Sequence, residues 1–377
     1  MSPAQTRAAE AAEKLERVRA YLADSGHSGV LFSRQFLISW ITAGMEDTVL
    51  RGQDPAFLSA LVTEDGAYLV TSNIEARRLE GEENPGEVGF EVVEVPWYEA
   101  HFHTALDDLV DVSKLANDGF GPGEDRSDAL QELRMRLTAG EADRMRQLGA
   151  DGCRALEDSI RTLRPGMTGR EMAAELSSRL EVDGIFPFAI FAGGDHRRMS
   201  YRHPNVSAAP FERDALVVIV GVRGGLNIAA TRTASIGEPD PDLAARHVIA
   251  AEAEGAAIAA TRPGNTYGQA LQAQIEVYEA HGYHDEWRNH TQGGPIGYGA
   301  REFGPGPLAA PDRFTEWPVE VGQACAWNPT VQGAKAEDTF LVGAEANELV
   351  SNSSSWPSIE VPAGDGSITR PAILEVG

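Results

Sequence analysis

The chain has 377 residues, which is enough for two domains and a large buried core. Its formal net charge of −25 argues against a nucleic-acid groove or an anionic membrane surface as the main partner. The only cysteines are Cys153 and Cys325, which excludes a disulfide framework and a cysteine-based zinc site. The amino-terminal segment lacks the apolar region of a signal peptide, and no apolar run approaches the roughly 20 residues of a membrane span. We therefore expect a cytoplasmic protein.

The first part of the chain alternates helices and strands. Residues 8–23 form a charged amphipathic pattern that predicts a helix. Strands are predicted at 28–33, 67–72 and 90–97. The stretch "NDGFGPGEDRSD", residues 117–128, is rich in Gly, Asp and Pro and indicates a domain boundary. We expect one domain over residues 1–125 and a second over residues 126–377.

An internal repeat organises the second part. The stretches from Arg164 to Gly184 and from Arg262 to Gly282 both begin with Arg-Pro-Gly and end with Gly at the same separation. Each contains a capping-box pattern, Thr168 with Glu171 and Thr266 with Gln269. Each follows a predicted helix, at 141–162 and 243–261. The repeat predicts two related halves, each made of two helices and strands.

Strands follow each half. Residues 215–237 read as a long β-hairpin with Gly224 and Gly225 at the turn. Residues 323–332 and 337–343 read as a second pair of strands. The segment 351–377, rich in Ser, Pro and Gly, is expected to be an extended strand or tail.

Several of these stretches carry a family resemblance. The motifs that carry it are "ISWITAG" at 38–44, "RPGMTGREMAAEL" at 164–176, "AATRTASIGEP" at 229–239 and "AEDTFLVG" at 336–343. They resemble the superfamily of creatinase, aminopeptidase P, prolidase and methionine aminopeptidase. The resemblance implies an α/β (α+β) chain in which a creatinase-like N-terminal domain precedes a pita-bread domain with an internal pseudo-twofold repeat. It also implies a homodimer.

The peptidases of that superfamily hold two metal ions with two Asp, one His and two Glu. Carried over by motif, these positions fall on Val218, Ala229, Gly294, Asn328 and Glu337. Only Glu337 keeps a ligand of the expected type. One carboxylate and one amide do not satisfy a divalent cation, which needs several oxygen or imidazole ligands. We therefore expect no metal and no other cofactor.

Polar side chains remain where the resemblance places the pocket. Creatinase uses this fold without a metal and protonates a nitrogen with a His, although the His that it keeps is Gly294 here. Acid–base chemistry is a task for groups tuned by burial, and we expect it first from His203 and then from His290. Glu302 matches the Glu of the family's His-Glu pair, and Glu337 is expected across the pocket, either as a catalytic or as a structural group.

Arginine, amide and phenol side chains complete the expected substrate site. They are Arg223, Arg301, Asn328, Tyr298 and Arg232. Because Arg301 replaces the His of the His-Glu pair, the pocket favours a carboxylate or phosphate, to which a guanidinium presents a two-pronged donor. For Arg232, a salt bridge that ties strands together is the favoured reading.

The function expected from these residues is a metal-independent enzyme that acts on a small carboxylate- or nitrogen-containing metabolite. Hydrolysis of a C–N bond is the leading reaction, with elimination or rearrangement as related possibilities. A non-catalytic binding module on the same fold is the first alternative. A metallopeptidase of the Xaa-Pro type with a relocated metal site is the second. The stretch from His284 to His290 contains ligand-type side chains, but its loose spacing favours polar loop residues over a metal site. A small molecule is the expected partner, with no nucleic acid and no membrane.

Overall fold

The computed structural model describes all residues except 1–2, 48, 100–101 and 307. The chain divides into two compact units. The first comprises residues 1–141 with 224–226, and the second comprises residues 142–223 with 227–377. This division falls at Glu141, two residues after the start of α6 (Ala139–Ile160). The domain boundary near residue 125 stays a prediction.

A six-stranded sheet forms the first unit, in the order β4-β3-β2-β1-β5-β6. The strands are β1 (Gly29–Phe32), β2 (Leu58–Val62), β3 (Ala67–Ser72), β4 (Glu91–Val95), β5 (Leu115–Asn117) and β6 (Glu124–Asp125). β2 pairs antiparallel with β1 and β3, whereas the β3–β4, β1–β5 and β5–β6 pairs are parallel. The helices are α1 (Pro3–Ser25), α2 (Gln35–Ile41), α3 (Ala76–Arg78), α4 (Phe102–Asp107) and α5 (Ser127–Arg134). The predicted helix and the three predicted strands are confirmed; β2, β5 and β6 were not predicted.

A buried lysine anchors α1 in this unit. Lys14 Nζ donates to Glu10 Oε1 at 2.6 Å and to the Trp40 carbonyl at 2.7 Å, and it lies 2.7 Å from Glu141 Oε1. None of its side chain is exposed. Two carboxylates and a carbonyl thus compensate for removing one ammonium group from water.

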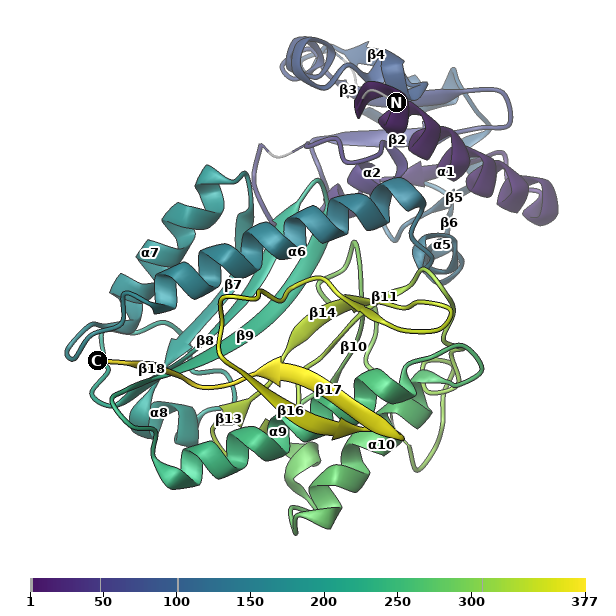
Figure 1. Ribbon diagram of the computed structural model, residues 1–377. Coiled ribbons are helices and arrows are strands. Elements are labelled where there is room, and N and C mark those ends of the chain that lie inside the picture. Colours follow the sequence, from purple (N-terminus) through teal and green to yellow (C-terminus); the bar gives the residue numbers. More distant parts are fainter. Residues whose placement is uncertain (1–2, 48, 100–101, 307) are drawn as a thin grey trace. The chain divides into compact units, whose positions relative to one another are not determined.

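The first half of the second unit is a helical pair over a sheet (Figure 1). After α6 come α7 (Gly169–Val182), β7 (Phe186–Gly193), α8 (Asp195–Ser200), β8 (Asp214–Arg223) and β9 (Leu226–Ile236). The sheet order is β18-β9-β8-β7, in which β18 is the strand Leu374–Val376 from the end of the chain. A Cβ on Gly152 of α6 would lie 2.9 Å from Ile228 of β9, so this glycine lets the helix pack closely on the sheet.

The second half repeats this plan. Its helices are α9 (Pro241–Ala260) and α10 (Tyr267–Ala280), followed by a 3-10 turn at Glu286–Asn289. Its strands are β10 (Gly293–Ile296), β11 (Ala324–Trp327), β12 (Thr330–Val331), β13 (Ala334–Lys335), β14 (Asp338–Leu341) and β15 (Glu348–Leu349). Four of them form the sheet β10-β11-β14-β15. The segment expected to be extended forms a hairpin of β16 (Ser358–Ala363) and β17 (Gly366–Pro371), and β18 (Leu374–Val376) pairs parallel with β9.

The internal repeat is confirmed at the level of individual hydrogen bonds. Both capping boxes form, with Thr168 and Glu171 starting α7 and Thr266 and Gln269 starting α10. Each capping threonine also makes an isolated β-bridge to a proline, Pro210 in one half and Pro318 in the other. The same local signals therefore begin the second helix of both halves.

The β8–β9 hairpin turns where the sequence predicted. Gly224 and Gly225 have φ of 54° and 77°, which is the left-handed backbone that a two-residue turn of this kind requires. Cys153 on α6 and Cys325 on β11 are both buried and unbridged. Among the residues that the structure describes, no helix is both long and apolar enough to cross a bilayer.

Candidate functional site

The positions at which the resemblance places metal ligands gather on neighbouring strands of the second unit. They are Val218 in β8, Ala229 in β9, Gly294 in β10, Asn328 after β11 and Glu337 before β14. Hydrogen bonds of 2.9 Å join β9 to the start of β14, from Thr231 N to the Glu337 carbonyl and from Ala229 N to Thr339 Oγ1. The five positions are therefore close in the fold, although only Glu337 carries a ligand of the expected type.

Position 294 has no room for the imidazole of the family. Gly294 has a φ of 140°, and a Cβ there would lie 2.8 Å from the Phe303 carbonyl oxygen and 3.0 Å from Pro305 Cδ. Arg301 Nη1 donates to the Gly294 carbonyl at 2.8 Å and to the Ala326 carbonyl at 2.5 Å. Gly294 and Ala326 face each other across β10 and β11, so one guanidinium nitrogen clips the two strands together. The loss of the ligand therefore involves the backbone as well as the side chain.

Glu337 lies at the centre of the remaining polar cluster. Its residue exposure is 3%, and its Oε2 accepts a hydrogen bond of 2.9 Å from Thr231 Oγ1. Arg301 Nη2 lies 3.8 Å from Oε1, and Lys335 Nζ lies 3.9 Å from Oε2. Both distances exceed the length of a hydrogen bond, so the two cations face the carboxylate but form no hydrogen bond with it.

Lys335 was missed in the sequence analysis. Its residue exposure is 4%. Burial lowers the pKa of Lys335, against the attraction of Glu337, and the charge of Arg301 lowers it further. The signal was available in "GAKAEDT": alternate residues of an extended segment point to the same side, and Lys335 stands two residues before Glu337.

The structure brings His203 and His290 together, although 87 residues separate them. Their Nε2 atoms are 3.1 Å apart, and Phe191 stacks on the His203 ring with centroids 4.8 Å apart. Burial, with the charges of Lys335 and His203, lowers the pKa of His290 to about 3. Burial and then Lys335 also lower the pKa of the exposed His203, while Glu337 opposes them. Both rings are therefore neutral near pH 7.

Asn328 also belongs to this region. Its residue exposure is 8%, and its backbone N–H donates to the Gln292 carbonyl at 3.0 Å. Its side-chain Oδ1 is buried and has no hydrogen-bond partner among the described residues. A buried amide oxygen without a donor costs free energy unless a ligand or water supplies one.

Glu302 and Tyr298 make hydrogen bonds that fix the loop after β10. Glu302 Oε1 accepts from the backbone N–H of Gly299 at 2.9 Å. Tyr298 Oη accepts from Arg144 Nη2 of α6 at 3.0 Å, and the residue exposure of Tyr298 is 2%. These contacts hold the loop between β10 and Arg301 in place. Glu302 and Tyr298 therefore position Arg301.

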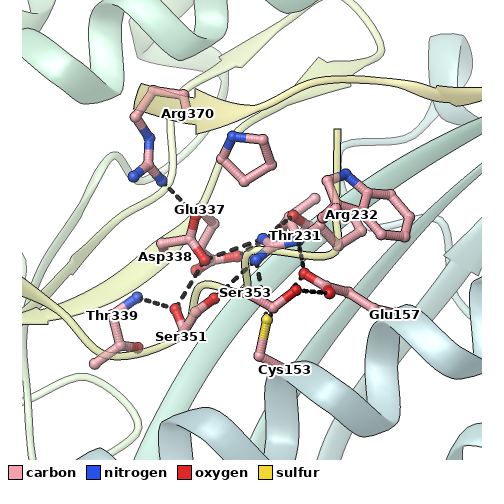
Figure 2. A network of polar contacts seen from close by, with 12 residues as sticks. Cys153, Glu157, Thr231, Arg232, Glu337, Asp338, Thr339, Ser351, Ser353 and Arg370 are labelled. Atoms are coloured by element: carbon pink, nitrogen blue, oxygen red, sulfur yellow. Dashed lines mark hydrogen bonds and ion pairs between the residues drawn. The ribbon is translucent and has the colours of Figure 1, made fainter. Parts of the chain in front are cut away.

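The structure does not bring Arg223 or Arg232 to the cluster. Arg223 Nη1 donates to Asp151 Oδ2 at 2.9 Å and to the Asp183 carbonyl at 3.1 Å, at the end of β8. Arg232 is entirely buried, and besides the carbonyl of the adjacent Thr231 four groups hold it, as Figure 2 shows. These are Glu157 Oε1 at 3.0 Å, Asp338 Oδ1 at 3.0 Å, the Ser351 carbonyl at 2.7 Å and Cys153 Sγ at 3.1 Å. The salt-bridge reading of Arg232 agrees with this arrangement.

The residues of the cluster do not fit a divalent cation. In the described part of the chain, no three His, Cys, Asp or Glu side chains are grouped as a metal site requires. Glu337 is the single carboxylate at the carried-over positions, and two cationic side chains lie within 4 Å of it. In the stretch from His284 to His290, Glu286 is engaged by Arg202 Nη1 at 2.6 Å and by the Gln332 N–H at 2.6 Å.

Known proteins are similar to this chain in sequence and in fold. Residues 143–344 match metallopeptidase family M24. The chain is 29% identical over 235 residues to a probable dipeptidase PepE of Mycobacterium tuberculosis, a match that covers 60% of this chain and 61% of that protein. This chain thus spans about six-tenths of that curated relative's length.

Solved structures are similar over almost the whole chain. The prolidase of Pyrococcus horikoshii has a TM-score of 0.74 at 17% identity, covering 91% of this chain and 99% of that one. Dipeptidase PepE of Mycobacterium ulcerans has a TM-score of 0.73 at 22% identity and covers 98% of both chains. These likenesses confirm the creatinase-like, pita-bread architecture. The chain belongs to metallopeptidase family M24, a family of hydrolases in the creatinase and aminopeptidase P superfamily.

Proposed function

We propose that this member of family M24 is a metal-independent hydrolase that cleaves a C–N bond in a small substrate carrying a carboxylate. The observation that carries the proposal is the pair of neutral imidazoles, His203 and His290, beside Glu337 and its two cations. The curated relative is a probable dipeptidase, and a dipeptide combines a C–N bond with a free carboxylate. The cluster described above offers acid–base groups in place of metal ligands.

The chemistry needs one proton acceptor that later becomes a donor. A neutral imidazole takes a proton from water while the water oxygen bonds to the carbon of the C–N unit. The imidazolium then gives that proton to the nitrogen as the C–N bond breaks, so one water is consumed and the histidine returns to its neutral form. Glu337, fixed by Thr231, is positioned to accept an N–H of the substrate. A hydrogen bond between the two rings lets one imidazole orient the other.

The test is turnover after metal removal. The purified chain, dialysed against a chelator and checked by elemental analysis, is assayed on dipeptides and N-acyl amino acids. We expect turnover to survive the chelator, and His203→Ala to lower kcat/KM by about 10² or more. His196→Ala, an exposed histidine on α8, is the matched control and should leave the rate unchanged.

Two results would contradict the proposal. Activity that disappears with the chelator and returns with a divalent ion supports a relocated metal site. An inactive chain that still binds members of the panel, with binding insensitive to His203→Ala, supports a non-catalytic binding module.

A further inference from the structure

The lysines of this chain differ sharply in the oxygen partners of their ammonium groups. There are three, Lys14, Lys114 and Lys335, and Lys114 is exposed. Lys14 is as buried as Lys335 and has three oxygen partners within 2.7 Å. Among the described residues, Lys335 Nζ has one polar contact, Glu337 Oε2 at 3.9 Å, and no hydrogen bond. An ammonium group has three N–H donors, so a buried lysine in this state is equipped to receive an acceptor from outside the chain.

Arg301 is fixed in a matching way. Its Nη1 is used by the carbonyls of Gly294 and Ala326, which holds the guanidinium plane in place. Its Nη2 faces Glu337 at 3.8 Å without a hydrogen bond. The Lys335 ammonium and the Arg301 guanidinium therefore present N–H donors around one carboxylate, at positions set by the protein before any ligand arrives. Preorganised donors of this kind lose little conformational entropy on binding.

The charge of the cluster selects the kind of acceptor. With both histidines neutral, Lys335 and Arg301 contribute two positive charges and Glu337 one negative charge. A monoanion brings the sum to zero, whereas a dianion such as phosphate leaves an uncompensated negative charge in a buried place. We propose that Lys335 Nζ and Arg301 Nη2 together bind the carboxylate of a small monoanionic ligand. This deepens the function proposed above, on which it rests for the identity of the site.

The binding pair also orders the rest of the ligand. Lys335 is close enough to both His203 and His290 for its charge to lower the pKa of each ring. A carboxylate held by Lys335 and Arg301 leaves the adjoining atoms of a small ligand facing these imidazoles. The anion favours the protonated form of Lys335, so we expect carboxylate binding to weaken as alkaline pH removes that proton.

The test uses acetate as the probe and the full chain labelled with ¹³C at the lysine Cε. Three lysines give three resonances, which Lys114→Gln and Lys335→Arg assign. During an acetate titration at constant ionic strength, we expect the Lys335 resonance to move to saturation and its titration midpoint to rise, while Lys114 stays unchanged. Phosphate should bind more weakly than acetate. An unchanged Lys335 resonance over the whole titration would overturn the inference.

Variants give the second readout, with calorimetry reporting acetate affinity. Lys335→Met keeps an unbranched side chain, one atom shorter, and removes the charge. We expect at least about a 10-fold loss of affinity, since a charge-assisted hydrogen bond is removed. Lys114→Gln is the matched control and should bind as the wild type does. If Lys335→Met bound acetate as tightly as the wild type does, the proposed binding by Lys335 and Arg301 would be refuted. This would hold even if His203→Ala still abolished turnover. Conversely, Lys335→Met could lose acetate binding while turnover proved sensitive to the chelator. That result would support the binding by Lys335 and Arg301 and refute the proposed metal-independent hydrolysis.

Discussion

Single residues set the charge and the shape of the cluster around Glu337. Gly294 has a positive φ, and the Arg301 guanidinium donates hydrogen bonds to the carbonyls of Gly294 and Ala326. A lysine and an arginine then face one carboxylate, and burial together with neighbouring charge lowers the pKa of two imidazoles. Each of these features depends on one or two side chains, so point substitutions can separate them.

Gly294→Ala tests the backbone at the lost ligand position. The positive φ and the contact with the Phe303 carbonyl predict a destabilisation of about 1–3 kcal/mol, measured by urea unfolding. Gly304→Ala is the control, because a Cβ on Gly304 meets no atom within 4 Å. Equal unfolding free energies for the two variants would contradict the strained backbone. Gly294→His should be no more stable than Gly294→Ala and should bind no metal by elemental analysis.

His290 links stability to acid. Its folded-state pKa of about 3 lies below the ordinary 6.5, so between these values the unfolded chain binds a proton that the folded chain does not. The contribution of this group therefore falls by about 1.4 kcal/mol per pH unit as the pH drops below 6.5. We expect the difference in unfolding free energy between wild type and His290→Asn to shrink from pH 7 to pH 5. His196→Asn controls for the loss of a histidine, and a pH-independent difference for His290→Asn would refute the linkage.

At the scale of elements, the two halves begin their second helices in the same way. Thr168 caps α7 and Thr266 caps α10, each in a complete capping box and each bridged to a proline. The local sequence sets these starts, because side-chain oxygens satisfy backbone N–H groups that the first helical turn leaves free.

Thr168→Ala and Thr266→Ala should each lower the unfolding free energy by about 1 kcal/mol. The double variant should show the sum, since the two caps share no partner. Thr→Ser at each position keeps the hydroxyl and serves as the control. Chemical denaturation of these five variants and the wild type decides this. A neutral effect in one half alone would show that its helix start is held by tertiary packing.

At the scale of the whole second unit, a buried ionic network joins the two halves. Arg232 of β9 reaches Glu157 of α6 and Asp338 of β14, and Asp338 also meets Arg370 of β17, as Figure 2 shows. Arg370 in turn contacts Glu254 of α9 at 2.7 Å. These elements come from both repeats and from the carboxyl-terminal hairpin. The network therefore links the two halves and the hairpin to one another.

Arg232→Met removes one charge from this network and leaves Glu157 and Asp338 without their common partner. We expect a loss of about 3–5 kcal/mol in unfolding free energy, as for other broken buried pairs. Arg246→Met, on a partly exposed arginine of α9, is the control and should cost far less. If Arg232→Met instead raised KM at unchanged stability, Arg232 would belong to the substrate site after all.

The sequence predicted features that are local and missed those that depend on chain path. The capping boxes, the Gly224–Gly225 turn and the repeat are written in neighbouring residues, and all are confirmed. The partner of Arg223 is Asp151, 72 residues away, and no spacing rule identifies it. The sequence shows Gly294 as a missing ligand, but its φ and its contact with Arg301 follow only from the packed strands. Lys335 was predictable from its spacing to Glu337, because alternate residues of an extended segment point to the same side.

The two thiols offer a practical advantage for spectroscopy. Burial raises the pKa of both Cys153 and Cys325, and each is enclosed by the second unit. Reagents that alkylate thiolates should therefore leave the native chain untouched. A cysteine introduced on the surface would be the sole labelling position, so spin labels or fluorophores can be attached without first deleting any native residue.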